Sequence, residues 1–444
     1  MVTFPNLMQD AGYHTVMAGK WHLGRDEGQR PQQRGFSRSF GCMDGGAGHF
    51  SDMQPIVPAQ GDKVVYREDD QLLDTLPSDF YTSKDYTEKM IQYIDESKRL
   101  GKPFMGFVAY TSPHWPLQVP DEYIDLYKGQ YNEGYEALAK RRLAGAKKMG
   151  AIPEHTQLPP LAPNVMPWDS LSEEEKQVQA RNMEVYAAMV ERMDFHIGQL
   201  IEHLKKIGEY DNTLIIFHSD NGAEGNSIMG YDGTGEWVDT TFDNSLENIG
   251  RMNSYVQQGP GWGHSSATPF SWYKAFSTEG GVRVPSIIAY PKWSLPAGAW
   301  NHDFLSIMDI APTILELTEI SHPDTVYEGR QIFPMNGVSM LSWLEGDAPN
   351  VHPADEAHGW ELFGRRGLRK GDWKLEWMED PYGNNNWELY NIKADITEQH
   401  NLASEQPDKL AELIADWETY VEANGVIIGS EPTSYGSEDY WQEE

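Results

Sequence analysis

The chain has 444 residues, 39% of them hydrophobic, which is enough to build one large domain and a smaller one. Its 68 Asp and Glu outnumber 35 Lys and Arg, and the net charge of -33 argues against nucleic acid as a partner, because the phosphates would be repelled. No apolar run is long enough to span a membrane, and the single cysteine, Cys42, excludes an internal disulfide. We expect a monomer without nucleic-acid or membrane partners.

The beginning of the chain has the pattern of the second half of a β-α-β unit. Residues 4–11 predict a helix and residues 13–18 a strand that follows directly, so we expect the first strand of the unit upstream of this sequence. Residues 1–6 lack the basic start and apolar core of a signal peptide, which predicts a cytoplasmic location. A true N-terminus further upstream leaves a periplasmic or secreted location open.

A basic pair stands at the end of this first strand. Lys20 and His22 are two residues apart, and in an extended chain that spacing places both side chains on one face. An ammonium and an imidazole aimed together could bind an anion and carry a proton. The alternative is that a Lys-x-His pair is ordinary surface.

The next predicted strand also ends at a histidine. Residues 81–98 predict a helix with an apolar stripe, and residues 103–110 predict a buried strand that leads to His114. Ligands of open α/β sheets bind at the carboxyl ends of strands, which makes His114 a candidate functional residue. A solvated loop histidine remains the alternative.

A long helix delivers the chain into the most informative strand. Ser172 caps residues 173–204, whose apolar side chains recur with a helical period. Residues 213–217 predict a strand buried on both faces, and Asp220 and Asn221 follow it. A carboxylate and an amide carbonyl suit Ca²⁺ or Mg²⁺, although Asp-Asn-Gly also forms an ordinary turn.

The remainder of the first domain contributes one more candidate. Lys274 precedes a Gly-Gly loop from which it could reach into a cleft, although it could also be a surface lysine. Residues 308–317 predict a helix that packs on the sheet. Strand and helix alternate with polar strand ends throughout residues 1–350, which predicts an α/β sheet flanked by helices in one domain.

The pattern changes beyond about residue 350. Residues 364–368, 373–377 and 387–390 predict short strands separated by turns, and residues 407–423 predict a closing helix. We therefore expect residues 351–444 to form a small C-terminal α+β subdomain with an antiparallel sheet.

Four motifs in register carry a resemblance to a known family. They are residues 19–24 (Gly-Lys-Trp-His-Leu-Gly), 112–116 (Ser-Pro-His-Trp-Pro), 219–222 (Ser-Asp-Asn-Gly) and 273–285, from Tyr-Lys-Ala-Phe to Glu-Gly-Gly-Val-Arg-Val-Pro. Together they resemble the type I, formylglycine-dependent sulfatases, and the chain looks closest to the bacterial arylsulfatases. Residues 185–194 also fit, and the resemblance runs from Met1 to about Val426.

The resemblance implies an alkaline-phosphatase-like mixed sheet and an arylsulfatase that uses one Ca²⁺ and a formylglycine nucleophile. By motif, the calcium ligands would be Asp220 and Asn221. Lys20 and Lys274 would hold the sulfate oxygens of a small sulfate ester. His22 would help to expel sulfate, and His114 would bind sulfate and protonate the leaving oxygen. The physical logic agrees, because cleavage of a sulfate ester needs charge neutralisation and a general acid.

The chain also departs from the family pattern. In the family, formylglycine is made from the Cys or Ser of a Cys/Ser-x-Pro/Ala-x-Arg motif upstream of the Gly-Lys-Trp-His stretch, and two more aspartate ligands lie earlier still. Neither is present here, and Cys42 lies downstream without the required Arg, so we do not expect it to be the nucleophile. The chain as given is therefore expected to be inactive. A phosphatase or phosphonate hydrolase of the same superfamily, or a non-catalytic binding remnant, remains an alternative.

Overall fold

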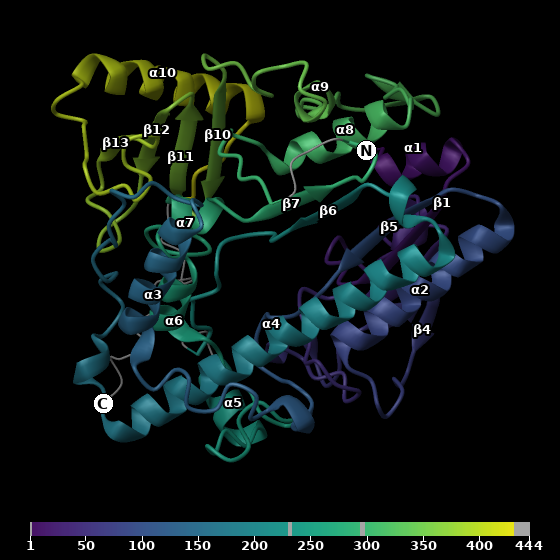
Figure 1. Ribbon diagram of the computed structural model, residues 1–444, viewed down its shortest axis with the longest axis horizontal. Helices are drawn as coiled ribbons and strands as arrows, with labels where there is room; N and C mark the ends of the chain where they lie inside the picture. The colour runs from purple at the N-terminus through teal and green to yellow at the C-terminus, as the bar shows by residue number, and fades with distance from the viewer. Residues whose placement is uncertain (1, 230–232, 294–297, 430–444) are drawn as a thin grey trace.

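The computed structural model describes residues 2–229, 233–293 and 298–429 of the chain. These residues form a layered α/β region and, towards the C-terminus, a separate antiparallel sheet (Figure 1). The largest sheet has the strand order β4-β3-β2-β1-β5. Its strands are β1 (His14–Gly19), β2 (Arg38–Cys42), β3 (Tyr66–Glu68), β4 (Gln71–Leu73) and β5 (Phe104–Ala109).

The helices connect and cover the sheets. The α-helices are α1 (Phe4–Asp10), α2 (Thr82–Leu100), α3 (Gly134–Lys148), α4 (Glu173–Ile207), α5 (Thr234–Thr241), α6 (Gly259–Ser266), α7 (Glu279–Val282), α8 (Ile310–Leu317), α9 (Leu341–Leu344) and α10 (Pro407–Asn424). The 3-10 helices are η1 (Pro31–Arg34), η2 (Pro58–Gln60), η3 (Asp121–Tyr123), η4 (Trp168–Ser170), η5 (Tyr210–Asn212) and η6 (Ile307–Asp309). Among the described helices, none is both long and apolar enough to cross a membrane.

Strand β1 is the centre of the largest sheet. It runs parallel to β2 and β5, whereas β3 and β4 extend the sheet in antiparallel fashion, so the sheet is mixed as expected. All six residues of β1 are buried, which is typical of a parallel strand covered on both faces. Because β1, β2 and β5 are parallel, their carboxyl ends meet at one edge, where the loops that carry Lys20 and His114 begin.

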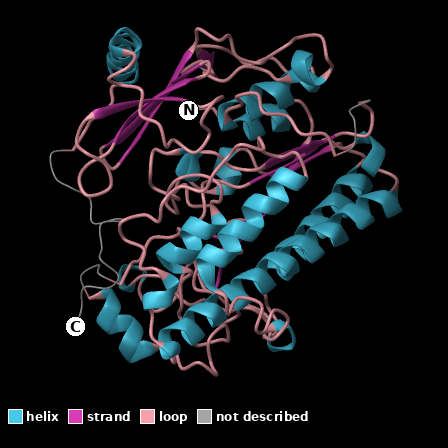
Figure 2. Cartoon of the chain, turned by 60° about the vertical axis from the view of Figure 1, so that its left-hand side comes forward, coloured by secondary structure: helices cyan, strands magenta, loops and turns pink. Residues whose placement is uncertain are grey.

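Helices cover both faces of β1. Val16 and Ala18 pack towards α2, and α4 packs on α2, so that the two long helices run side by side (Figures 1 and 2). Met17 points to the opposite face and packs with residues of α1 and α8. The alternation of side chains along β1 thus builds two separate apolar layers from one strand.

The start of α4 confirms the predicted cap. The Ser172 hydroxyl accepts a hydrogen bond from the backbone N–H of Glu175 at 3.2 Å, and the Glu175 carboxylate accepts one from the Ser172 N–H at 2.7 Å. This reciprocal pair satisfies two donors that the first helical turn would leave free. The predicted apolar stripe is less regular, because Val190 is exposed.

The strand predicted at residues 213–217 forms, but the prediction that it is buried on both faces is wrong. It is β6 (Ile215–His218), whose four residues are half-buried, and it pairs antiparallel with β7 (Ser286–Ala289) in a two-stranded sheet. The exposed fractions of Ile287 in β7 and Phe107 in β5 are 61% and 43%, so β5 is not fully buried either. In the described residues, β5 and β6 each have a hydrogen-bonded strand on one side only.

The C-terminal part contains the expected antiparallel sheet and one strand that was not expected. Its strands, in spatial order, are β10 (Ala357–Leu362), β11 (Arg365–Lys370), β12 (Trp373–Trp377) and β13 (Trp387–Asn391), of which β10 was missed. Helix α10 packs on this sheet through Leu413 and Trp417. A small hairpin of β8 (Val326–Tyr327) and β9 (Arg330–Gln331) precedes it.

A buried ionic cluster joins this sheet to the rest of the molecule. The Lys374 Nζ atom in β12 lies 3.2 Å from Glu279 of α7 and 2.5 Å from Glu398, and all three side chains are buried. The pKa of Lys374 is raised despite its burial, because these carboxylates surround it. The Glu398 carboxylate also accepts a hydrogen bond from the Glu279 N–H at 2.8 Å.

Candidate active site

The carboxyl end of β1 is built for close backbone contact. Gly19 has a φ of 123°, and a Cβ atom there would lie 2.1 Å from the carbonyl oxygen of Ala109 in β5. The Lys20 N–H donates to that same carbonyl at 2.9 Å, and the Trp21 N–H donates to Cys42 of β2 at 2.8 Å. The backbone before and after Lys20 is therefore fixed between two neighbouring strands, which positions the lysine side chain.

Both Lys20 and His22 have a lowered pKa. Burial and the neighbouring Lys274 lower the pKa of Lys20, while Asp220 acts in the opposite direction. Partial burial and the charge of Lys20 lower the pKa of His22, which Asp44 opposes. His22 has a left-handed backbone with a φ of 54°, so its direction is imposed by the turn at this strand end.

His114 lies in the loop that follows β5, and one of its ring nitrogens is already engaged. Its Nδ1–H donates to the carbonyl oxygen of Trp115 at 2.7 Å, which leaves Nε2 as the nitrogen available to a ligand. Burial lowers the pKa of His114 to about 4, with Lys274 acting in the same direction and Glu224 opposing it. The side chain is therefore neutral at pH 7 in the free protein.

A buried histidine that the sequence did not reveal supports this loop. The His49 Nε2–H donates to the carbonyl oxygen of His114 at 3.0 Å, and its Nδ1 accepts a hydrogen bond from the Thr82 hydroxyl at 2.8 Å. His49 is fully buried, and burial lowers its pKa to about 4. His49 thus connects the His114 loop to the first turn of α2.

Asp220 and Asn221 stand at the end of β6 in a turn that only glycine permits. The Gly222 N–H donates to Gly281 at 3.0 Å, and a Cβ at Gly222 would lie 2.0 Å from the carbonyl oxygen of Gly280. The Asn221 Nδ2 donates to the Gly222 carbonyl at 2.8 Å, while its Oδ1 accepts no hydrogen bond from the described residues. The exposed Asp220 carboxylate and this amide oxygen are the kind of donors that suit a hard cation, and they could supply two of the roughly six to eight oxygens that calcium takes.

Lys274 is held by an acidic partner that the sequence reading missed. Its Nζ atom lies 2.7 Å from the Glu224 carboxylate, and its backbone N–H donates to Ala223 at 2.9 Å. Burial raises the pKa of Glu224, but Lys274 and His114 together lower it below the ordinary value. Glu224 is only two residues beyond Gly222, and its nearness to a motif was the one signal that could have identified it.

The structure brings the predicted site residues into electrostatic range of one another. Lys274 acts on the pKa values of Lys20, His22 and His114, and Asp220 acts on that of Lys20. These side chains come from the ends of β1, β5 and β6 and from the segment before α7. Two basic side chains and two imidazoles beside oxygen ligands can bind a tetrahedral anion and move a proton.

Two hollows open beside these groups. The larger has a volume of about 490 Å³, and its wall combines His22 and His114 with the apolar side chains of Met43, Ile56 and Trp115. The smaller, of about 140 Å³, is lined by Asn221 and Lys274, among others. Both hollows are thus largely apolar with a few polar groups, the two histidines lining the larger one and Asn221 and Lys274 the smaller.

Comparisons with known proteins identify the family of the chain. The sulfatase family profile matches residues 1–320, and the profile described as N-sulphoglucosamine sulphohydrolase, C-terminal, matches residues 269–423. An uncharacterised sulfatase of Schizosaccharomyces pombe is 40% identical over 434 residues, which cover 96% of this chain and 78% of the yeast protein. An arylsulfatase of Klebsiella aerogenes is 38% identical over 341 residues, covering 77% of this chain and 72% of that enzyme.

Solved structures show the same fold. The crystal structure of Ps i-CgsB in complex with k-i-k-neocarrahexaose has a TM-score of 0.63 at 23% identity, covering 94% of this chain and 73% of the other. A phosphonate monoester hydrolase from Silicibacter pomeroyi has a TM-score of 0.54 at 17% identity, covering 95% and 80%. The architecture is that of the alkaline-phosphatase-like enzymes, and the chain belongs to the sulfatase family.

Proposed function

We propose that this chain carries the sulfate-binding and leaving-group residues of an arylsulfatase. The observation that supports the proposal is the electrostatic convergence of Lys20, Lys274, His22 and His114 at neighbouring strand ends. A sulfate monoester carries one negative charge in a tetrahedral group, and two ammonium groups neutralise it where solvent is partly excluded. Membership of the sulfatase family supports the hydrolysis of a sulfate ester as the reaction.

The properties of His114 suit a general acid that becomes active only with substrate. In the free protein its pKa of about 4 leaves Nε2 unprotonated at pH 7. A bound anion beside the ring favours the charged form and raises the pKa, so that Nε2 takes up a proton and passes it to the departing oxygen. Its Nδ1–H bond to Trp115 keeps the ring in the orientation that this transfer needs.

The larger cavity favours an aromatic or apolar alcohol as the leaving group. Its volume of about 490 Å³ and its Met43, Ile56 and Trp115 walls offer apolar contact to a ring next to His22 and His114. The 38% identity to an arylsulfatase supports the same preference. Arg25 and Asp44 at the cavity, 3.4 Å apart, add a polar rim.

Asp220 and Asn221 are the residues that we propose to hold a Ca²⁺. A bound divalent cation there would supply positive charge for the sulfate group and the nucleophile. The exposed carboxylate of Asp220 and the free Oδ1 of Asn221 are the correct kind of donor, and further ligands must complete the shell.

We further propose that the formylglycine nucleophile comes from outside these 444 residues. Cys42 is fully buried, and burial raises its pKa to about 12, so it cannot present a reactive side chain to a substrate. The chain as given should then bind sulfate but hydrolyse esters poorly.

The proposal is tested by comparing two proteins on paired aryl sulfates and aryl phosphates. One is the 444-residue chain, and the other is a form extended upstream, co-expressed with a formylglycine-generating enzyme. Sulfatase activity of the extended form that falls by orders of magnitude on Lys20→Ala or His114→Ala is the expected result. A preference for phosphate or phosphonate esters would instead assign the chain to another branch of the superfamily, and equal activity of the short form would show that the nucleophile lies within it.

A further inference from the structure

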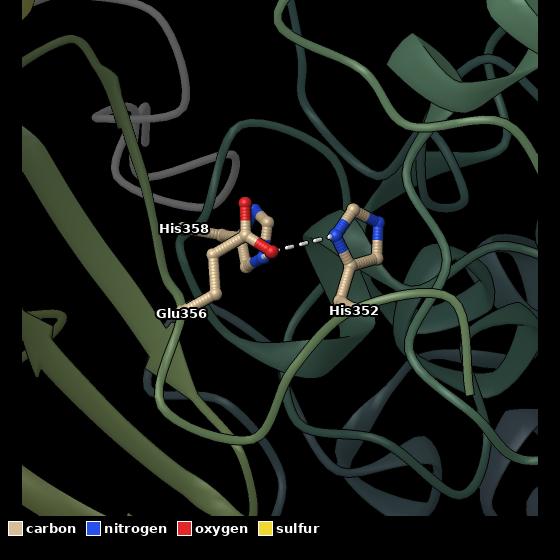
Figure 3. Close-up of side chains that lie close together, drawn as sticks. All are labelled: His352, Glu356 and His358. Carbon is tan, nitrogen blue, oxygen red and sulfur yellow. Dashed lines mark hydrogen bonds and ion pairs between the residues drawn. The ribbon is translucent and has the colours of Figure 1, made fainter. Parts of the chain in front are cut away.

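A second group of metal-ligating side chains lies in a part of the chain that none of the sulfatase motifs covers. His352, Glu356 and His358 occupy the loop before β10 and the start of that strand. Figure 3 shows that the Glu356 carboxylate points to the His352 ring and lies beside the His358 ring. Their potential ligand atoms all lie within 4.8 Å of one another.

The distances fit a small divalent cation. The His352 Nδ1 is 3.2 Å from the Glu356 Oε2, and the same oxygen is 3.7 Å from the His358 Nε2. Zinc holds nitrogen and oxygen ligands at about 2.0–2.2 Å, so that neighbouring ligand atoms of a tetrahedral site lie about 3.4 Å apart. The two nitrogen–oxygen distances bracket that spacing, and the two histidine nitrogens lie within 4.8 Å of each other, so a small closure of the cluster would complete it.

The outer partner of His352 determines which nitrogen faces the cluster. Its Nε2 lies 2.8 Å from the Oδ2 of Asp309, which is fully buried in η6 and accepts hydrogen bonds from the Ser306 and Val338 N–H groups. The Nε2 must therefore carry the proton, and the Nδ1 turns towards Glu356. A carboxylate that orients a histidine through its far nitrogen is the usual outer support of a metal ligand.

A nitrogen acceptor and a carboxylate oxygen 3.2 Å apart repel each other unless a proton or a metal ion lies between them. A second proton on His352 is one possibility, and it would join the ring to both Asp309 and Glu356. A proton on His352 would not satisfy the Nε2 of His358, which is buried and makes no hydrogen bond with the described residues. A metal ion would engage all three groups at once, including this otherwise unsatisfied nitrogen.

The surroundings support a bound cation. Asp309 and Glu356 contribute two negative charges, which outweigh the one positive charge of Arg369 among the groups that act on His358. The side chains of His352 and His358 are 5% and 13% exposed, but Glu356 is 37% exposed, which leaves a path from solvent and room for a water ligand.

We propose that His352, Glu356 and His358 form a zinc-type site, with Asp309 as its outer support and water in the fourth position. The ion would fasten the start of β10 to η6 and so tie the C-terminal sheet to the helical layer that contains α8. Two histidines and one carboxylate prefer Zn²⁺ and similar transition metals, and this donor set differs from the all-oxygen pair at Asp220 and Asn221.

The experiment measures metal binding by the 444-residue chain after treatment with a chelator. Zinc chloride is added in calorimetric titrations, and Co²⁺ serves as a spectroscopic probe of tetrahedral coordination. We expect one equivalent to bind and to raise the melting temperature, because the ion binds the folded state. Glu356→Gln and His358→Gln should each weaken Zn²⁺ binding by more than about 100-fold, since the loss of a ligand exceeds the loss of an outer partner.

Two controls separate this site from other sources of metal binding. His400→Gln removes one member of an exposed His–Glu pair, 3.1 Å from Glu405, that has no third ligand among the described residues, and it should leave binding unchanged. Asp220→Asn should also leave zinc binding unchanged, since that residue belongs to the oxygen pair. The proposal is overturned if Zn²⁺ does not saturate, or if Glu356→Gln and His358→Gln bind it as the unaltered chain does while circular dichroism shows them folded.

Discussion

The Nζ atom of Lys274 lies 2.7 Å from the carboxylate of Glu224, and both side chains are largely enclosed. The contact fixes a lysine at the end of a loop that would otherwise be free to turn away from the site. It also places a negative charge within range of His114, where it opposes the fall in the pKa of that ring. One carboxylate thereby influences both the position of a cation and the acidity of a histidine.

We predict that Glu224→Gln changes the acidity of His114 without weakening substrate binding. The amide keeps an oxygen for Asn226 but removes the charge, so the pKa of His114 should fall further while Lys274 keeps its positive charge for the sulfate group. In the extended, active form, kcat for aryl sulfates should fall about 10- to 100-fold while KM stays the same or decreases, because the substrate is an anion. Glu422→Gln, on the exposed side of α10, is the matched control. A rise in KM at constant kcat would contradict this role.

Acid should destabilise the protein through His49. Its pKa in the folded state is about 4, against an ordinary value of 6.5, so the unfolded chain binds the proton more readily. The contribution of His49 to the free energy of unfolding is therefore fully present above pH 6.5, and about 3 kcal/mol of it is lost as the pH falls from 6.5 to 4. Urea unfolding across this range should show a shallower decline for His49→Gln, which has no titrating ring. An identical pH dependence for the two proteins would exclude this contribution.

Gly222→Ala should disable the site with little effect on the rest of the fold. The new Cβ would lie 2.0 Å from the Gly280 carbonyl oxygen, so the turn that carries Asp220 and Asn221 must move. We expect at least a 100-fold loss of aryl sulfatase activity in the extended form, since a misplacement of about 1 Å can have that effect. Gly145→Ala in α3, where nothing lies within 4 Å, is the control and should be neutral or slightly stabilising. Full activity of Gly222→Ala would mean that this turn does not position the site.

Lys374→Met should lower the stability of the whole chain. It removes the cation that Glu279 and Glu398 surround and leaves two buried carboxylates facing each other. Loss of one partner of a buried ion pair is destabilising by about 3–5 kcal/mol, which thermal and urea unfolding would detect. Lys393→Met removes a lysine that is 78% exposed and should change stability by less than about 0.5 kcal/mol. Equal melting temperatures for the two variants would show that the cluster is not stabilising.

The sequence predicted the parts of the site that follow strands. Lys20 and His114 could be placed because they follow the parallel strands β1 and β5, whose carboxyl ends meet at one edge of the sheet. Asp220 follows β6, which pairs antiparallel with β7, so the same rule does not explain its approach to Lys20. The cap at Ser172 could be placed because its partner is three residues away. The half-exposed state of β6 could not be predicted, since burial depends on which strands become neighbours. A run of apolar residues does not indicate which strands will become its neighbours.

The residues that were missed act through partners distant in sequence. His49 binds Thr82 and His114, which are 33 and 65 residues away, and a lone histidine in a glycine-rich loop carries no signal of either contact. For Glu224, the only signal in the sequence was its nearness to the Ser-Asp-Asn-Gly motif. Strand β10 was missed because its Ala-His-Gly-Trp-Glu-Leu sequence does not alternate clearly between polar and apolar residues.

The cluster of Lys374, Glu279 and Glu398 has a consequence for how the molecule melts and evolves. Glu279 is five residues from Lys274, while its partner Lys374 belongs to a strand almost 100 residues later. The ion pair therefore couples the stability of the C-terminal sheet to that of the loop that carries a candidate sulfate-binding lysine. The domain boundary near residue 350 stays a prediction, and this ion-pair cluster connects residues on its two sides. Substitutions on the far sheet can therefore be selected for their effect on the anion-binding loop, and the two regions should unfold in a single transition.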